Sequence, residues 1–106
     1  FYRMDIIEYL YKLTLDNYIS NDILSDNPLF ETILINFMSK NISLINSEES
    51  IHKFILLLHY ELDMQFYKKP TKDIISQVKK NDKSRLRFEV KKLSLDIKKL
   101  YQSIQN

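Results

Sequence analysis

Histidine and carboxylate side chains are the residues best suited to chemistry, and their spacing offers little for catalysis. The 106 residues include two His and no Cys or Gly, so a thiolate nucleophile and a glycine-rich phosphate loop are both excluded. His52 and His59 lie on one predicted helix about 10 Å apart along its axis, too far to share a metal ion. Each has a carboxylate four residues away, Glu48 and Asp63, the spacing of a helical surface pair. We therefore expect no enzyme, metal site, cofactor or small-molecule substrate.

A stripe of cations in the last third of the chain is the second set of chemically active residues. Residues 1–66 hold four Lys/Arg against ten Asp/Glu, and residues 67–106 hold twelve against four. Capture of phosphates requires such a basic stripe, and the alternative is a solvated face balanced by the acidic half. Nucleic-acid binding is therefore the alternative function, and its candidate contacts are Arg85, Arg87, Lys91, Lys92, Lys98 and Lys99.

The element that must position these cations is a predicted helix from Leu86 to Ile104. Its apolar residues form a heptad with Val or Ile at a and Leu at d, which favours two parallel helices but also suits a helix that folds back on its own domain. Phe88 and Leu95 fall nearly opposite, so we expect burial on both sides of the helix. The stripe either packs inside the domain or pairs with another chain. Both can hold if the helix uses one face for its own domain and the other face for the partner. Its candidate partner-binding residues are Leu86, Val90, Leu93, Ile97, Leu100 and Ile104.

Capping residues and apolar periodicity predict the other helices. A first helix follows Asp5 over about residues 5–16, and residues 19–24 form a short helical turn. Asn27 and Pro28 begin a helix that runs to about residue 40, because Asn caps the free amide groups and Pro is tolerated at the first helical position. Its apolar face is Phe30, Ile33, Leu34, Phe37 and Met38, widened by Leu29 and Ile35.

The most apolar helix, over about residues 47–67, is expected at the centre of the core. Its predicted core residues are Ile51, Phe54, Ile55, Leu58 and Leu62, with Leu57 beside them.

Start and stop signals set the bounds of this helix and the next. Asn46 and Glu49 resemble a capping box at its start, and Lys68-Lys69-Pro70 ends it. Thr71 begins the next helix, and a break at Asn81-Asp82 is favoured over one helix across residues 71–105. We predict an all-α fold, a compact bundle of four to five helices with a long C-terminal helix of coiled-coil character.

An apolar order also runs through the first two thirds of the chain, carried by Ile19, Ile23, Leu24, Leu29 and Ile33 and then by Ile51, Ile55, Leu58 and Leu62. Over residues 5–66 this order resembles the helical domain at the amino end of transcription elongation factor TFIIS. Phe30 stands where that family usually has Gly, and Leu62 where it usually has Trp, so no site residues are transferred. The resemblance implies docking of disordered peptide motifs in nuclear proteins.

Composition also limits the compartments in which we expect the chain. The longest apolar run, Phe54 to Leu58, is about a quarter of the ~20 residues that a membrane span needs, so we expect no membrane partner. The absence of Cys favours an intracellular compartment, nuclear or cytoplasmic. Because the chain begins at Phe1 rather than Met, we expect a fragment of a larger protein.

Within the fragment we expect one domain over residues 1–106, with an acidic helical core over 1–69 and a basic C-terminal segment over 70–106. These observations together predict a non-enzymatic protein–protein interaction module, a scaffold for complex assembly. It would bind a protein partner, or itself as a homodimer, through the C-terminal heptad helix.

Overall fold

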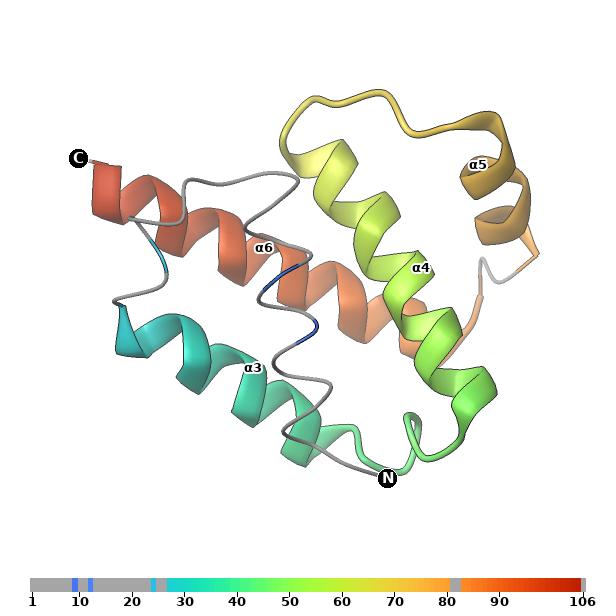
Figure 1. Ribbon diagram of the computed structural model, residues 1–106, viewed down its shortest axis with the longest axis horizontal. Helices are drawn as coiled ribbons and strands as arrows, with labels where there is room; N and C mark the ends of the chain where they lie inside the picture. Colours follow the sequence, from blue (N-terminus) through green and yellow to red (C-terminus); the bar gives the residue numbers. More distant parts are fainter. Residues whose placement is uncertain (1–8, 10–11, 13–23, 25–26, 81–82, 106) are drawn as a thin grey trace.

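The computed structural model describes residues 9, 12, 24, 27–80 and 83–105, which form four helices and no strand. Figure 1 shows α3 (Pro28–Lys40), α4 (Glu48–Gln65), α5 (Lys72–Lys79) and α6 (Arg85–Gln105). The all-α prediction is confirmed, whereas the helix count of the whole chain and the coiled-coil character of its last helix stay predictions. The helices expected over residues 5–16 and 19–24 lie outside the described residues except at Tyr9, Lys12 and Leu24.

Side-chain caps begin α3, α5 and α6. Asn27 Oδ1 accepts a hydrogen bond of 2.9 Å from the Leu29 N–H, and Pro28 follows at the first helical position. Thr71 Oγ1 accepts one of 3.3 Å from the N–H of Ile74 at the start of α5. Ser84 Oγ accepts one of 3.2 Å from the N–H of Arg87 in the first turn of α6. Two predicted helix starts and the break between α5 and α6 are thereby confirmed.

The capping box of α4 differs from the predicted one. Ser47 Oγ accepts a hydrogen bond of 3.1 Å from the Ser50 N–H, and Ser50 Oγ accepts one of 2.9 Å from the Ser47 N–H. The predicted pair, Asn46 and Glu49, has the same spacing but lies one residue too early and is wrong. The reciprocal Ser47–Ser50 hydrogen bonds fix the start of α4, and the fully buried Ile45 holds the preceding loop against the core.

The end of α4 has an unusual backbone. The Lys68 N–H donates to the Asp63 carbonyl oxygen at 2.8 Å, the hydrogen bond of a Schellman motif, which requires a left-handed residue between them. That residue is Tyr67, with φ of 61°. A left-handed residue other than Gly costs about 1–2 kcal/mol, and the chain contains no Gly to take the position. The helix therefore ends at Gln65, two residues earlier than predicted.

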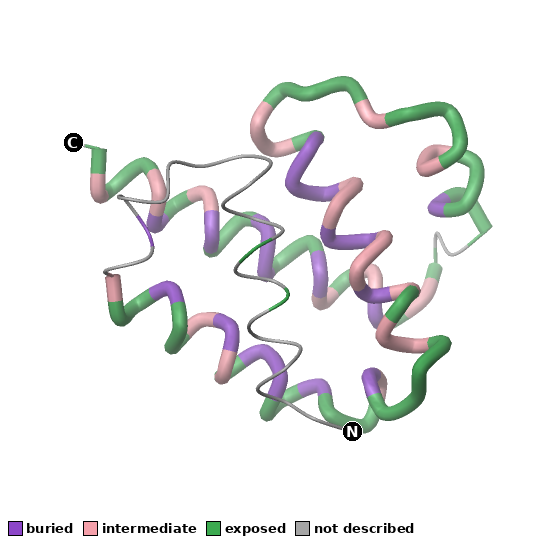
Figure 2. Tube along the Cα trace, viewed as in Figure 1, coloured by how far each residue is buried: buried purple, intermediate pink, exposed green. Residues whose placement is uncertain are grey.

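The core lies where α3, α4 and α6 meet. Figure 1 shows α6 running antiparallel beside α3 and crossed by α4, while α5 packs on α4. The Phe37 and Phe54 rings stack between α3 and α4 with their centroids 5.1 Å apart. Figure 2 shows that buried residues recur along these three helices and that α5 is mostly exposed. The fully buried apolar side chains are Leu24, Phe30, Leu34, Met38, Ile45, Phe54, Leu57, Leu58, Leu62, Val90 and Ile97.

Two details of the predicted core faces are wrong. Leu57 is fully buried, whereas Ile51 and Ile55 are only partly buried, so the core face of α4 is centred closer to Leu57 than the periodicity indicated. Leu29 does not widen the core face of α3, because its side chain is 57% exposed in the first turn. Periodicity identifies the apolar side of a helix, but the neighbouring helices decide how much of it they cover.

Candidate functional site

The heptad stripe of α6 lies inside the domain. Its six residues pack against the core shared with α3 and α4, and only Ile104, in the last turn, is partly exposed. Burial of each such side chain contributes roughly 1.5–3 kcal/mol, so the stripe is a main source of stability. Contact of these side chains with another chain would require α6 to separate from α3 and α4. The buried members are Leu86, Val90, Leu93, Ile97 and Leu100.

The opposite side of α6 is open to solvent. Phe88 is 56% exposed and Leu95 is 43% exposed. The expectation that α6 is buried on both sides is therefore wrong within this chain, because α3 and α4 both pack on the stripe side. These two side chains leave an apolar ridge on the outer surface of the domain.

The end of α4 extends this ridge. Met64 is 51% exposed, and it lines a shallow groove of about 340 Å³ between α4 and α6 together with Leu95 and Lys91. Tyr67, in the left-handed position, is 89% exposed, and the Lys98 Nζ lies 4.6 Å from the centre of its ring. We call this surface the α4–α6 face, and it consists of Met64, Tyr67, Phe88, Lys91, Leu95 and Lys98.

Sequence analysis missed the place on this face of Met64, at the end of α4, and of Tyr67, just beyond it. The available signal was their place on the helix, since Met64 lies off the side defined by Leu58 and Leu62, and Tyr67 follows it by three residues. Nothing in the spacing showed that they would lie beside α6, because that proximity depends on the crossing of the two helices.

A charged pair joins α4 to α6 beneath the face. Glu61 Oε1 lies 3.8 Å from Arg87 Nε, beyond hydrogen-bond distance, and both side chains are largely buried. The Arg87 guanidinium also lies 5.5 Å from the centre of the Tyr60 ring. Burial raises the pKa of the Glu61 carboxyl, and the positive charges of Lys91 and Arg87 oppose that effect. Both members of the pair line the groove between α4 and α6.

The predicted nucleic-acid contacts fall into two rows along α6. Because residues seven apart return to nearly the same side of a helix, Arg85, Lys92 and Lys99 form one row, and Arg87, Lys91 and Lys98 form the other. Phe88 and Leu95 lie between the rows by the same geometry. Four of the cations are exposed, Arg87 and Lys98 are partly buried, and Lys92 Nζ lies 3.6 Å from Glu89 Oε1.

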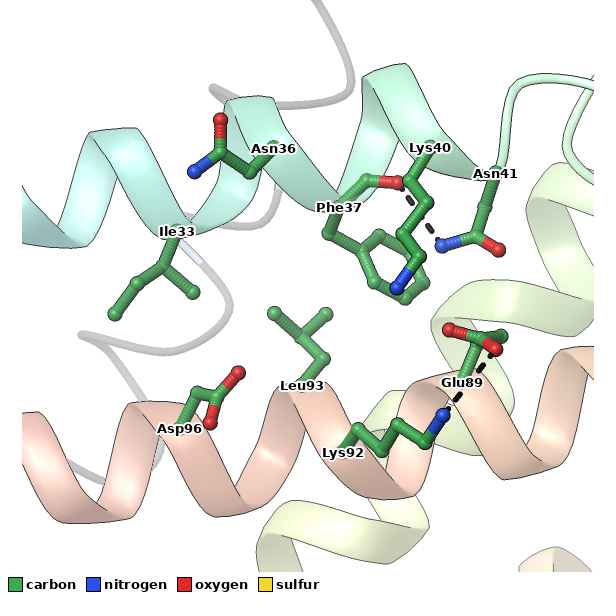
Figure 3. A pocket seen from close by; sticks show the side chains of 9 residues that line it. All are labelled: Ile33, Asn36, Phe37, Lys40, Asn41, Glu89, Lys92, Leu93 and Asp96. Carbon is green, nitrogen blue, oxygen red and sulfur yellow. Dashed lines mark hydrogen bonds and ion pairs between the residues drawn. The ribbon is translucent and has the colours of Figure 1, made fainter.

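A second groove, of about 230 Å³, lies between α3 and α6 (Figure 3). The apolar side chains of Phe37 and Leu93 line it, and Asn41 Nδ2 at its edge donates a 3.1 Å hydrogen bond to the Phe37 carbonyl oxygen. Two cations and two carboxylates also line it, Lys40, Lys92, Glu89 and Asp96. Because these charges balance, the groove has no preference for a ligand of either sign.

The described part of the chain holds neither a metal-ligand cluster nor a membrane-spanning helix. Among residues 9, 12, 24, 27–80 and 83–105, no group of three or more His, Cys, Asp or Glu could hold a metal ion. No helix of that part is long and apolar enough to cross a membrane. His59 Nε2 lies 3.5 Å from Asp63 Oδ2, which confirms the expected pairing of this histidine along the helix.

Comparison with models of known families, with curated protein sequences and with solved structures finds no match for this chain. The resemblance of residues 5–66 to the TFIIS domain gains no support from them. The function has to be inferred from the surface that the residues themselves build.

Proposed function

We propose that this chain is a non-enzymatic protein–protein interaction module of a larger complex and that it binds its partner through the α4–α6 face. The observation that carries the proposal is the gathering of exposed apolar side chains there. Seven large apolar side chains are exposed in the described residues, and four of them lie on this face: Met64, Tyr67, Phe88 and Leu95. Contiguous exposed apolar patches mark interaction sites, and interfaces are enriched in Met and aromatic residues.

In this proposal the two sides of α6 have different tasks: the buried stripe holds the helix in place, and the outer side contacts the partner. The buried stripe holds α6 against α3 and α4, which fixes the orientation of the helix. Phe88 and Leu95, on the other side, are thereby presented in a constant position, and a pre-organised surface loses less entropy on binding than a mobile one. The proposal keeps the C-terminal helix as the binding element and moves the contact from its stripe to its outer side.

Site-specific photo-crosslinking tests the proposal. A photoreactive residue is placed at Leu95, at Met64 and, as a matched control, at Leu29, which is equally exposed but lies on α3. In cells that produce the chain, we expect the same protein to be captured from Leu95 and Met64 but not from Leu29. The purified partner should then bind the Leu95→Asp variant about tenfold or more weakly. Equal capture from all three positions, or no loss on Leu95→Asp, would contradict the proposal.

Nucleic-acid binding is the second candidate, favoured by the exposure of four cations in two rows: Arg85, Lys91, Lys92 and Lys99. Phosphate contacts of this kind release counterions, so affinity should fall steeply with salt. Titration with short DNA and RNA at several salt concentrations separates the two candidates. Steep salt dependence together with loss in a Lys91/Lys92/Lys98/Lys99→Glu variant would favour nucleic acid, and absent binding would eliminate it.

A further inference from the structure

Building on the proposed function, we infer that the α4–α6 face accepts an acidic amphipathic helix of the partner protein. Its apolar side chains would pack on Met64 and Leu95, and its carboxylates would lie against the lysines of α6. The inference joins two observations, the shape of the apolar surface and the sign of the charges around it.

The apolar side chains on α6 have the spacing that a helical partner would match. Met64 and Leu95 face one groove from two different helices, and Phe88 extends the apolar surface along α6. Phe88 and Leu95 are seven residues apart, about 10.5 Å along the helix axis. An amphipathic helix presents apolar residues at i, i+3, i+4 and i+7, which is the same repeat. A helix lying along α6 can therefore meet Phe88 and Leu95 with two of its own turns.

The charges beside this surface are positive on the α4 side of the ridge, whereas Glu89 and Asp96 stand among the lysines on the α3 side. Lys91 and Lys98 lie toward α4, and Lys99 lies in the row toward α3. Glu61, which also lines the groove, is paired with Arg87 inside the domain. Carboxylates on the side of an incoming helix that faces α4 would thus find opposite charges in Lys91 and Lys98.

The same charges disfavour a second copy of this chain as the occupant. Two copies that met through this face would bring together two surfaces of net positive charge, and like charges across an interface cost affinity. Nucleic acid fits the cations but not the ridge between them. A nucleic acid whose phosphates contacted both rows would place its charged backbone over the apolar side chains of Leu95 and Met64. The phosphates would lose water there without gaining hydrogen bonds.

Peptide binding tests the inference directly. The probe is a designed helical peptide of about 21 residues, with Leu at a and d positions and Glu at the flanking positions, labelled for fluorescence anisotropy. Its matched control replaces every Glu by Lys. We expect the acidic peptide to bind the 106-residue chain about tenfold or more tightly than the basic peptide, and we expect this preference to shrink as NaCl rises from about 50 to about 500 mM.

Variants locate the peptide on the face. Leu95→Asp should weaken acidic-peptide binding about tenfold, while Leu29→Asp, on α3, should leave it unchanged. The double variant Lys91→Glu/Lys99→Glu should reverse the preference, so that the basic peptide binds more tightly. The matched charge control is Lys69→Glu/Lys72→Glu, at exposed positions outside α6, which should keep the original preference. Circular dichroism melting checks that each variant is folded.

The outcomes separate this inference from the proposed function. Equal binding of the two peptides, or an unchanged preference in the Lys91→Glu/Lys99→Glu variant, would overturn the acidic helix. If neither peptide binds while photo-crosslinking at Leu95 still captures a protein partner, the acidic helix is wrong and the interaction module stands. If short nucleic acids or anionic vesicles bind instead, and the same double variant abolishes that binding, both proposals are wrong.

Discussion

The two sides of α6 carry apolar residues at the same seven-residue spacing, yet they have opposite fates. Leu86, Leu93 and Leu100 are buried against the rest of the domain, whereas Phe88 and Leu95 lie in solvent. The difference arises from the neighbours, since α3 and α4 both pack on one side of the helix. Apolar spacing thus identifies surfaces that need a dry contact, and the tertiary fold decides which surface is satisfied within the chain and which is left for a partner.

The largest expected effect comes from charging the buried side. Leu93→Asp/Ile97→Asp would place two carboxylates among fully or nearly fully buried side chains. We expect the loss to exceed about 5 kcal/mol, which approaches the whole stability of a small domain, so the variant should be unfolded. Far-ultraviolet circular dichroism and light scattering measure the result. Unchanged melting together with an unchanged molar mass would show that the stripe does not hold the fold.

The matched change on the exposed side should have little effect on folding. Phe88→Asp/Leu95→Asp alters two side chains that are already about half exposed. Surface substitutions usually stay within about 0.5 kcal/mol, so the melting temperature should barely move. A loss as large as that of Leu93→Asp/Ile97→Asp would mean that the outer side of α6 is part of the core, and the comparison between the two sides would fail.

The sequence was sufficient for features that depend on near neighbours. Asn27, Pro28 and Thr71 predicted two helix starts, because a cap acts on residues two or three positions away. The exposure of Phe88 and the position of Met64 beside Leu95 could not be predicted, since both depend on where α4 crosses α6. The left-handed backbone at Tyr67 also gave no signal, because that position usually carries Gly and this chain has none.

The next effect concerns α4, which packs on the buried stripe of α6. Leu57→Ala should cost about 2–5 kcal/mol, because it leaves a cavity at a fully buried position of α4. Ile55→Ala is the matched control, two residues away on the same helix and only partly buried, and it should cost clearly less. Chemical denaturation measures both changes. Equal losses of stability in the two variants would mean that the core face of α4 is centred where the apolar periodicity predicted it.

A smaller effect is expected at the end of the exposed face. Tyr67→Gly should stabilise the chain by about 1 kcal/mol, because Gly adopts the left-handed conformation of the Schellman motif without the steric cost that Tyr bears. For a domain of this size that corresponds to a rise of about 4–8 °C in melting temperature. Tyr67→Ala removes the same ring but keeps the Cβ, so it should show no such gain. A gain shared by both variants would trace the cost to the exposed ring rather than to the backbone.

The smallest effect lies at the boundary between the two sides, where Glu61 meets Arg87. Because burial raises the pKa of Glu61, the folded chain binds a proton more tightly there than the unfolded chain, whose Glu titrates near about 4.3. This contribution to stability is present below that pH and is lost as the pH rises through the folded-state pKa. Glu61→Gln cannot titrate, so its melting temperature relative to the natural chain should increase as the pH rises above the pKa of the unfolded-state Glu, about 4.3. A relative melting temperature that instead falls with pH would mean that attraction to Arg87 and Lys91 outweighs burial, and that this pair holds α4 and α6 together as a net stabilising bridge.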